Sequence, residues 1–258
     1  MNDSPPLPPE QPQILARADG ETIAYHKTDG AGPTVVFLCG LRSDMTGTKA
    51  MALEAFCRER GQAYLRFDYQ GHGQSSGDFT DGTIGRWAED ALAVIDAATE
   101  GPLVLVGSSM GGWIMLLVAK ARARRLAGMV GVAAAPDFTR QMMERELTED
   151  QRAALLRDGI VYLSSDYSDE PTPLTLAFIE DGNRNAVLDA PIAVDCPVRL
   201  LQGMRDPDVP WEWALRVADG IAAEDVEITL VKAGDHRLSE PDDIQRLLRA
   251  VKEVCARA

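Results

Sequence analysis

A serine between two glycines, at the junction of an apolar strand and an apolar helix, most constrains what this chain can fold into. The run Leu103-Val104-Leu105-Val106 precedes the motif Gly107-Ser108-Ser109-Met110-Gly111, and an apolar helical segment follows at 113–120. A sharp strand-to-helix turn has no room for side chains at the two glycine positions. Such a turn exposes the Ser109 hydroxyl and places the Met110 N–H at a helix N-terminus, where negative charge is stabilised. The context predicts a nucleophilic serine rather than an ordinary glycine-rich turn.

Strand and helix patterns alternate along most of the chain, which is typical of an α/β fold with a mostly parallel sheet flanked by helices. Continuous apolar runs such as Val35–Leu38 indicate strands that are covered on both faces. We expect an antiparallel hairpin within 14–27 and strands at 35–38, 63–67, 103–106, 128–133, 198–201 and 226–231. The expected helices cover 48–60, 83–98, 113–120, 212–218 and 241–256.

The alternation breaks at 136–196, where no clear strand stands out. Amphipathic pieces at 137–147, 148–156 and 174–179 predict a small helical insertion at the carboxyl edge of the sheet, the position of a lid. Most of its apolar side chains should pack the lid on the core and some should line an acyl pocket: Phe138, Met142, Met143, Leu147, Leu155, Leu156, Ile160, Val161, Tyr162, Leu163, Phe178 and Ile179. We therefore predict a single domain at 14–258 that carries this lid.

The amino-acid composition excludes several classes of binding partner. A formal net charge of −14 excludes general affinity for nucleic acid or for an anionic membrane surface, because both need a basic protein face. No apolar stretch reaches the length of a transmembrane helix, so integral membrane association is not expected. Nothing in the sequence implies a cofactor or a metal ion, and the expected partner is a small-molecule or acylated substrate.

The N-terminal residues predict an extended arm and a cytoplasmic protein. Residues 1–13 are rich in proline and lack both the basic and apolar regions of a secretory signal and the arginines of a mitochondrial presequence. Cys39, Cys57, Cys196 and Cys255 show no C-x-x-C spacing. We expect reduced thiols in a cytoplasmic protein.

A serine nucleophile needs a neighbouring base, and only one histidine fits. Of His26, His72 and His236, only the last follows Ser109 in the chain, which is the order that this strand-turn-helix arrangement uses. His236 stands in a loop directly after the strand expected at 226–231. It is therefore the candidate general base. The turn containing Gly71-His72-Gly73 is predicted to brace the loop beneath the site and has no role of its own.

The orienting acid should lie in the loop that follows the strand at 198–201. That loop contains Asp206, three residues after Gly203, and Asp208 two residues later. Of these two candidates, we favour Asp206 as the acid that holds the histidine tautomer and stabilises the imidazolium, and we expect Asp208 to brace the turn. For the oxyanion we expect two backbone donors, the N–H groups of Met110 and Leu41.

Several strings of residues extend the argument beyond the single motif. They are Gly107–Trp113, Thr46–Ala50, Gly203–Asp206 with Val209–Trp211, and Asp235–Arg237. With these strings the chain resembles the α/β-hydrolase serine esterases, and within them the mitochondrial branch of acyl-protein thioesterases (depalmitoylases) and acyl-glucuronide esterases. The resemblance implies an α/β-hydrolase fold, hydrolysis of acyl bonds and a triad on the matching positions Ser109, Asp206 and His236. Where general α/β-hydrolases have His-Gly, this chain has Cys39-Gly40.

The expected function is cleavage of carboxylic ester or thioester bonds through an acyl-enzyme, on substrates with an apolar acyl group. Arg42 and Arg237 flank the expected site in sequence, where a carboxylate or phosphate of the substrate would find a partner. Two alternatives stay open at this point. One is a non-catalytic binding module built on the hydrolase fold, and the other is peptidase, perhydrolase or C–C hydrolase chemistry on the same triad.

Overall fold

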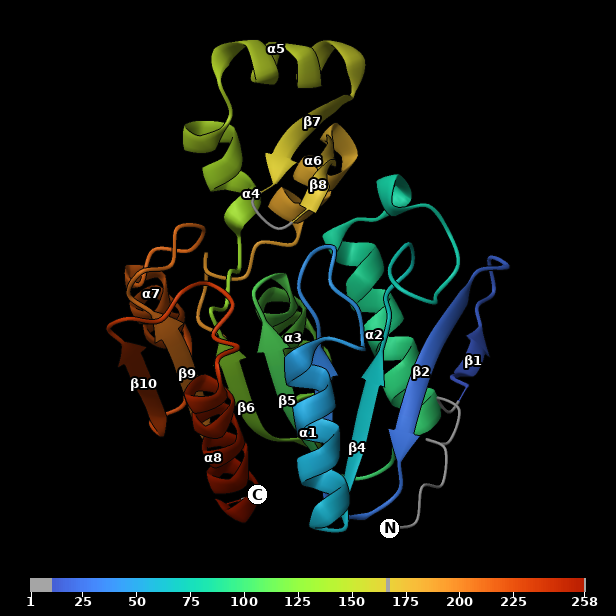
Figure 1. Ribbon diagram of the computed structural model, residues 1–258, viewed down its shortest axis with the longest axis vertical. Helices are drawn as coiled ribbons and strands as arrows, with labels where there is room; N and C mark the ends of the chain where they lie inside the picture. Colours follow the sequence, from blue (N-terminus) through green and yellow to red (C-terminus); the bar gives the residue numbers. More distant parts are fainter. Residues whose placement is uncertain (1–10, 166–167, 258) are drawn as a thin grey trace, which may run out of the picture.

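An eight-stranded sheet forms the centre of the computed structural model, which describes residues 11–165 and 168–257 (Figure 1). The strand order is β1-β2-β4-β3-β5-β6-β9-β10. The strands are β1 (Gln13–Ala16), β2 (Thr22–Thr28), β3 (Ala31–Leu38), β4 (Gln62–Phe67), β5 (Leu103–Ser108), β6 (Leu126–Val132), β9 (Val198–Gly203) and β10 (Val226–Val231). Only the pairs β1–β2 and β2–β4 are antiparallel, as expected of a sheet with a hairpin at one edge.

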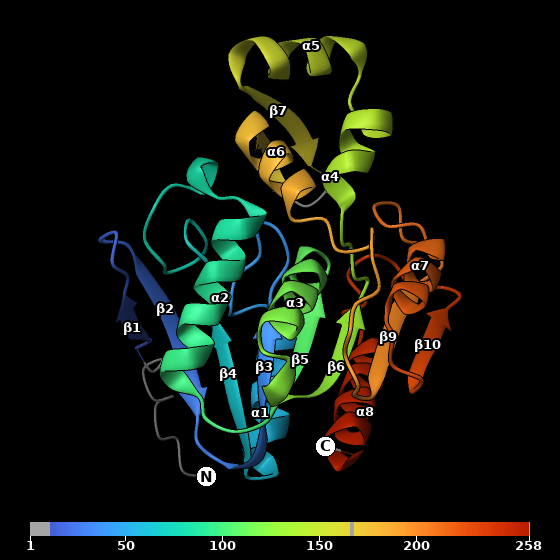
Figure 2. The same ribbon diagram turned by 180° about the vertical axis from the view of Figure 1, so that it is seen from behind.

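Helices cover both faces of this sheet. Helices α1 (Thr48–Glu59) and α8 (Pro241–Arg257) lie on one face, and α2 (Ile84–Ala98), α3 (Met110–Ala121) and α7 (Glu212–Gly220) lie on the other (Figures 1 and 2). The strands β5 and β9 are buried along their whole length, because helices cover them from both sides. The predicted α/β class with a mostly parallel, helix-flanked sheet is confirmed. The short 3₁₀ turns η1 (Phe79–Asp81) and η2 (Ala123–Arg125) were not expected.

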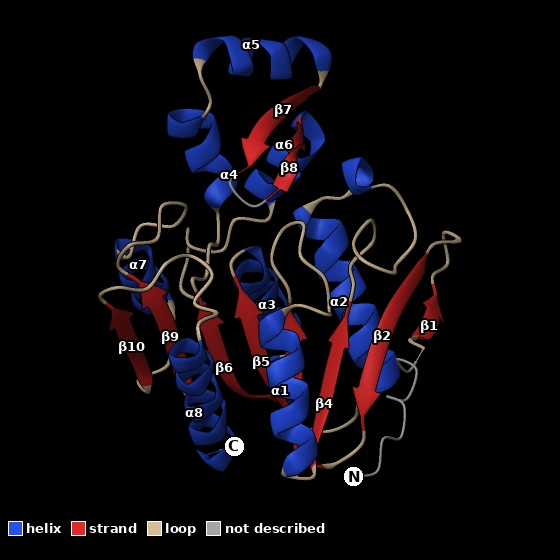
Figure 3. Cartoon of the chain, in the orientation of Figure 1, coloured by secondary structure: helices blue, strands red, loops and turns tan. Residues whose placement is uncertain are grey.

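A separate layer, the cap (residues 137–188), stands above the carboxyl edge of the sheet between β6 and β9 (Figures 1 and 3). It contains α4 (Phe138–Gln141), the π-helical turn η3 (Met142–Glu146), α5 (Glu149–Asp158), β7 (Ile160–Ser165), β8 (Ser168–Thr175) and α6 (Leu176–Arg184). The antiparallel pair β7–β8 is a difference from the expected all-helical insertion. Pro171 and Pro173 made a strand unexpected here, because proline has no N–H to donate to a neighbouring strand. In a two-stranded sheet both strands are edge strands, on which proline is tolerated.

Asp137 ties the two chain crossings of the cap together. This residue has a left-handed backbone (φ 60°) and is buried. Its carboxylate accepts hydrogen bonds from the N–H groups of Val187 (2.8 Å) and Leu188 (2.9 Å), which lie where the chain leaves the cap. One side chain therefore joins the entrance of the cap to its exit.

Three sequence expectations concern other parts of the chain. Most of the arm predicted at 1–13 lies outside the described residues. Cys39, Cys57, Cys196 and Cys255 have free thiols in the structure. In the described part of the chain, no helix has the length and apolar character needed to cross a bilayer.

Candidate active site

Ser109 occupies a strained turn between β5 and α3. Its φ of 55° and ψ of −122° lie in a backbone region that residues other than glycine rarely adopt. Neighbouring backbone holds it there: the Ser109 N–H donates to the Val132 carbonyl (2.9 Å), and the Ser109 carbonyl accepts from the N–H groups of Gly112 (2.8 Å) and Ala135 (3.1 Å). The end of β6 thus fixes the conformation of the turn.

The two glycines of the motif are required by close packing. A Cβ atom on Gly107 would overlap the backbone of Gly111, and one on Gly111 would overlap the carbonyl oxygen of Leu38 at the end of β3. Neither neighbour can move as the tip of a flexible side chain can, because both are backbone. The spacing G-x-S-x-G therefore reflects the contact of helix α3 with two adjacent strands.

His236 and Asp206 meet Ser109 from the loops after β10 and β9. The Nε2 atom of His236 lies 3.0 Å from Ser109 Oγ, and its Nδ1 atom lies 2.9 Å from Asp206 Oδ2. Asp206 is held in turn, since Oδ2 also accepts from the Gln202 side chain (2.9 Å) and Oδ1 accepts from the Val209 N–H (2.8 Å). A hydroxyl, an imidazole and a buried carboxylate in one hydrogen-bonded row form an arrangement in which the imidazole can accept a proton from serine.

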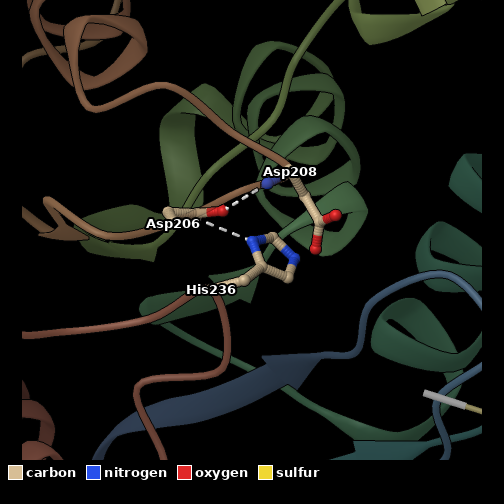
Figure 4. Close-up of side chains that lie close together, drawn as sticks. All are labelled: Asp206, Asp208 and His236. Atoms are coloured by element: carbon tan, nitrogen blue, oxygen red, sulfur yellow. Dashed lines mark hydrogen bonds and ion pairs between the residues drawn. The ribbon is translucent and has the colours of Figure 1, made fainter. Parts of the chain in front are cut away.

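Asp208 takes a different place from Asp206. Its N–H donates to Asp206 Oδ1 (2.9 Å), while its exposed carboxylate turns away from Asp206 and lies beside the imidazole (Figure 4). Ligand atoms of Asp206, Asp208 and His236 lie within 4.8 Å of one another. A metal ion on this trio would have to break the Asp206–His236 hydrogen bond, so the hydrogen-bonded row and a metal site exclude each other here.

The loop after β3 reaches the same point from the opposite side. A Cβ atom on Gly40 would lie 3.3 Å from Ser109 Cβ, so the loop rests directly on the serine. Leu41 and Met110, the two predicted oxyanion donors, both line the cavity in front of Ser109. Met110 is the first residue of α3, where the backbone N–H has no acceptor within the helix.

A cavity of about 570 Å³ separates the strand ends from the cap. Ser109 and His236 line it, together with Phe138 and Met142 from the cap. A smaller apolar cavity of about 30 Å³ adjoins it, sharing Leu41, Met142 and Thr172 and reaching Leu163 and Phe178. Other apolar cap residues take no part: Leu156 and Tyr162 are 60% and 61% exposed, and Leu147, Leu155 and Ile179 are buried in the core.

Charged groups line one end of the large cavity. Arg237 lines it as expected, but the guanidinium of Arg42 is engaged by the cap, where it donates to the Pro171 carbonyl (2.9 Å) and to Thr172 Oγ1 (3.2 Å). Lys49, which the sequence analysis missed, lines the same end and donates to Ser239 Oγ (3.2 Å). Burial, together with the nearby charge of Arg237, lowers the pKa of Lys49 to about 8. The sequence signal that could have identified Lys49 is its position in the first turn of the helix that follows β3, close to the expected oxyanion loop.

The fold and this site are those expected of a hydrolase that carries a serine on a strand-to-helix turn of a mostly parallel sheet. The sequence model of the Alpha/beta hydrolase family matches residues 35–250, and the chain belongs to that family. It is a hydrolase, as the resemblance implied.

Individual relatives cover nearly the whole chain. The human palmitoyl-protein thioesterase ABHD10, mitochondrial, is 40% identical over 242 residues, which are 93% of this chain and 79% of that protein. The structure of mouse alpha/beta hydrolase domain-containing protein 10 superimposes with a TM-score of 0.88 at 38% identity, covering 95% of this chain and 98% of that one. A crystal structure from Agrobacterium vitis S4 gives a TM-score of 0.90 at 43% identity over 96% and 100% of the two chains.

These relatives also correct one prediction. The cytoplasmic location predicted above is wrong by this comparison, because the curated relatives at 38–40% identity are all named as mitochondrial proteins. That prediction depended on the charge of the N-terminal residues, most of which lie outside the described part of the chain. The prediction used the composition of the N-terminal residues alone, whereas the similarity to the mitochondrial relatives is a similarity of the folded domain.

Proposed function

We propose that the protein hydrolyses carboxylic esters or thioesters through an acyl-enzyme, with Ser109 as nucleophile, His236 as general base and Asp206 as orienting acid. The observation that carries this proposal is the unbroken hydrogen-bond row from Ser109 through His236 to Asp206, with its serine end in the wall of a 570 Å³ cavity. The relatives named as palmitoyl-protein thioesterases support the same type of bond.

In the first half-reaction Ser109 Oγ forms a bond to the acyl carbon, and its proton moves to His236 Nε2. The carbonyl oxygen becomes an oxyanion that accepts hydrogen bonds from the N–H groups of Leu41 and Met110. The tetrahedral intermediate then breaks its bond to the leaving alkoxide or thiolate, which takes the proton from His236. Asp206 holds the imidazole in the required tautomer throughout and stabilises its charged form.

In the second half-reaction water replaces the leaving group. His236 accepts a proton from water as the water oxygen bonds to the acyl carbon of the Ser109 ester. The same two N–H groups stabilise the second oxyanion. Collapse breaks the bond to Ser109 Oγ, returns the proton to it and releases the carboxylic acid, so that the enzyme is unchanged after one cycle.

The cap residues that line the cavity favour a substrate with an apolar acyl group. In this proposal the cap serves as the lid of a single hydrolase domain. Phe138 and Met142 bring apolar surface from the cap to the cavity beside Ser109. The adjoining small cavity continues this surface toward Phe178 and Leu163 and is almost entirely apolar. Methionine and aromatic side chains suit an acyl chain because they offer large, adaptable apolar contact.

Intact-mass labelling with a fluorophosphonate probe tests the proposal. The probe should add one adduct to the wild-type protein and none to Ser109→Ala, because an activated serine hydroxyl is needed to bond to the phosphorus atom and expel fluoride. A series of p-nitrophenyl esters and matching acyl thioesters of increasing chain length then gives the acyl preference, and His236→Ala should abolish turnover of the whole series. Failure of the folded wild-type protein to react would overturn the proposal and favour the non-catalytic binding module.

A further inference from the structure

The backbone of Arg42, next to the proposed oxyanion donor Leu41, is strained. Its φ of 55° lies in the left-handed region, which an arginine occupies only when its surroundings hold it there. Two groups do so. The guanidinium is bound by the cap at Pro171 and Thr172, and the backbone N–H donates to Nε2 of His72 at 3.2 Å.

The direction of the second hydrogen bond assigns the tautomer of His72. The Nδ1 atom lies 3.2 Å from the carbonyl oxygen of Gln70, which can only accept, so Nδ1 carries the hydrogen and Nε2 offers its lone pair to Arg42. Burial lowers the pKa of His72 to about 4. The ring is therefore neutral near pH 7, and the acceptor is available.

The ring of His72 cannot turn away from Arg42. It is 4% exposed and makes edge contacts with Tyr69, Phe79 and Trp87, at centroid distances of 5.7, 5.2 and 4.9 Å. Trp87 Nε1 donates to the same Gln70 carbonyl (3.0 Å), so the acceptor of the His72 N–H is fixed as well. A rigid aromatic cluster, built from the loop after β4, η1 and α2, thus presents a single lone pair to the neighbouring loop.

The peptide held by His72 adjoins the peptide that faces the substrate. The Arg42 N–H belongs to the Leu41–Arg42 peptide, and the Leu41 N–H belongs to the Gly40–Leu41 peptide, with only the two backbone angles of Leu41 between them. Gly40 rests on Ser109 at the other end. Among the described residues, no hydrogen bond from the Leu41 N–H competes with an oxyanion.

We propose that His72 is a positioning residue for acyl transfer: by accepting from the Arg42 N–H, it orients the Leu41 N–H toward the oxyanion. The proposal rests on the function proposed above and adds a residue outside the triad. It differs from a general bracing role, because it assigns the effect to one lone pair, that of Nε2, rather than to the packing of the ring.

Two substitutions of similar chemistry separate these roles. In His72→Gln the side-chain amide reaches the former Nε2 position and retains an acceptor for Arg42. In His72→Asn the amide reaches only the Nδ1 position and retains the contact with Gln70 alone. We expect kcat for a p-nitrophenyl ester to fall about 10- to 100-fold in His72→Asn with KM within twofold, since loss of one oxyanion donor costs about 10²–10³-fold in a comparable enzyme. His72→Gln should stay within about threefold of wild type.

A trifluoromethyl ketone inhibitor provides the second readout, since its adduct with serine carries an oxyanion. Its affinity should fall in His72→Asn by the same factor as kcat and should change little in His72→Gln. Equal loss in both variants, or a loss of melting temperature with unchanged kcat, would overturn the proposal. If His72→Asn does not fold, His72→Phe keeps the aromatic packing and carries the same expectation. A wild-type enzyme that fails to react with the fluorophosphonate would instead remove the proposed function itself.

Discussion

The ends of the central strands are packed more tightly than the cap. Near the strand ends, a Cβ atom on Gly111 would overlap the backbone at the end of β3, and one on Gly203 would overlap the backbone of the loop after β10. In the cap, Gly159 has no atom within 4 Å of the position that its Cβ would take, and the nearest atoms to a Cβ on Gly182 belong to side chains, those of Thr139 and Trp113. Large apolar side chains such as Tyr162 lie exposed in the cap, whereas Ser109, Asp206 and His236 are enclosed by backbone and hydrogen bonds.

This difference matches what each region has to do. Acid–base chemistry requires reacting atoms to be placed within a few tenths of an ångström, which only rigid elements with supporting contacts provide. Binding an acyl chain requires area and adaptability, which a lightly packed layer offers at lower stability. Substitutions at the strand ends should therefore change rate constants steeply, and substitutions in the cap should change stability or affinity more gently.

The largest expected effect is at the acid. Asp206→Asn should reduce kcat by about 10⁴-fold, as the corresponding change does in a serine protease, because the amide favours the wrong tautomer of His236. Asp208→Asn is the matched comparison, since it removes an exposed carboxylate beside the same imidazole, and it should cost less than about tenfold. Steady-state kinetics on one p-nitrophenyl ester measures both. If Asp208→Asn is the more damaging, Asp206 is not the orienting acid.

The next expected effect compares two glycines. Gly111→Ala should force α3 away from the Leu38 carbonyl, and a displacement of about 1 Å at the nucleophile costs about 10²-fold in rate. Gly159→Ala meets no steric contact and should cost about 1 kcal/mol of unfolding free energy for its left-handed backbone (φ 77°), with the rate unchanged. Kinetics and chemical denaturation on both proteins provide the measurement. Similar rate losses would show that the two regions are equally constrained.

The same contrast explains which features could be predicted from the sequence. The strand ends follow from local patterns: a buried strand, a turn residue at its end, and the chain order of serine, acid and base. Strand β8 could not be predicted in this way, because proline usually interrupts a strand. Only the pairing of β8 with β7 shows that the prolines are tolerated there. The contact of His72 with Arg42 depends on β3 and β4 being neighbours in the sheet, which no pattern within either segment reveals.

A third prediction addresses the junction of the two regions. Asp137→Asn keeps a residue type that accepts the left-handed backbone, but it places an amide N–H₂ against the Val187 or Leu188 N–H. We expect a loss of about 1–3 kcal/mol of unfolding free energy, the cost of a buried donor without an acceptor. Limited proteolysis should cut the cap faster, and kcat/KM should fall by about threefold to tenfold.

Asp189→Asn is the control for this experiment. Asp189 directly follows the cap and forms an ion pair with Arg140 of the cap (2.7 Å), and its side chain is 61% exposed. Such a pair contributes about 0–1 kcal/mol, so the variant should behave as wild type. Faster proteolysis in Asp189→Asn than in Asp137→Asn would mean that Asp137 does not hold the cap.

The last expected effect is a difference in acid sensitivity between the two regions, which changes stability and leaves the rate constants aside. His72 has a pKa of about 4 in the folded protein and 6.5 when exposed, because burial disfavours its charged form. Its folded pKa is the lower one, so its contribution to stability is complete above pH 6.5 and is lost as the pH falls through 4. Asp68, in the same loop cluster, acts in the opposite sense: burial raises its pKa from 3.8 to about 6, so its contribution is lost as the pH rises through that range.

Comparing wild type with His72→Gln isolates the histidine, since Asp68 is common to both proteins. The difference in unfolding free energy should shift against wild type by up to about 2–3 kcal/mol between pH 6.5 and pH 4, measured by denaturant unfolding. The cap contains no histidine. Proteolysis of the cap should therefore respond to this pH change no more in wild type than in His72→Gln. A pH-independent difference between the two proteins would mean that His72 is charged or exposed, and the rigid strand-end cluster would lose its central member.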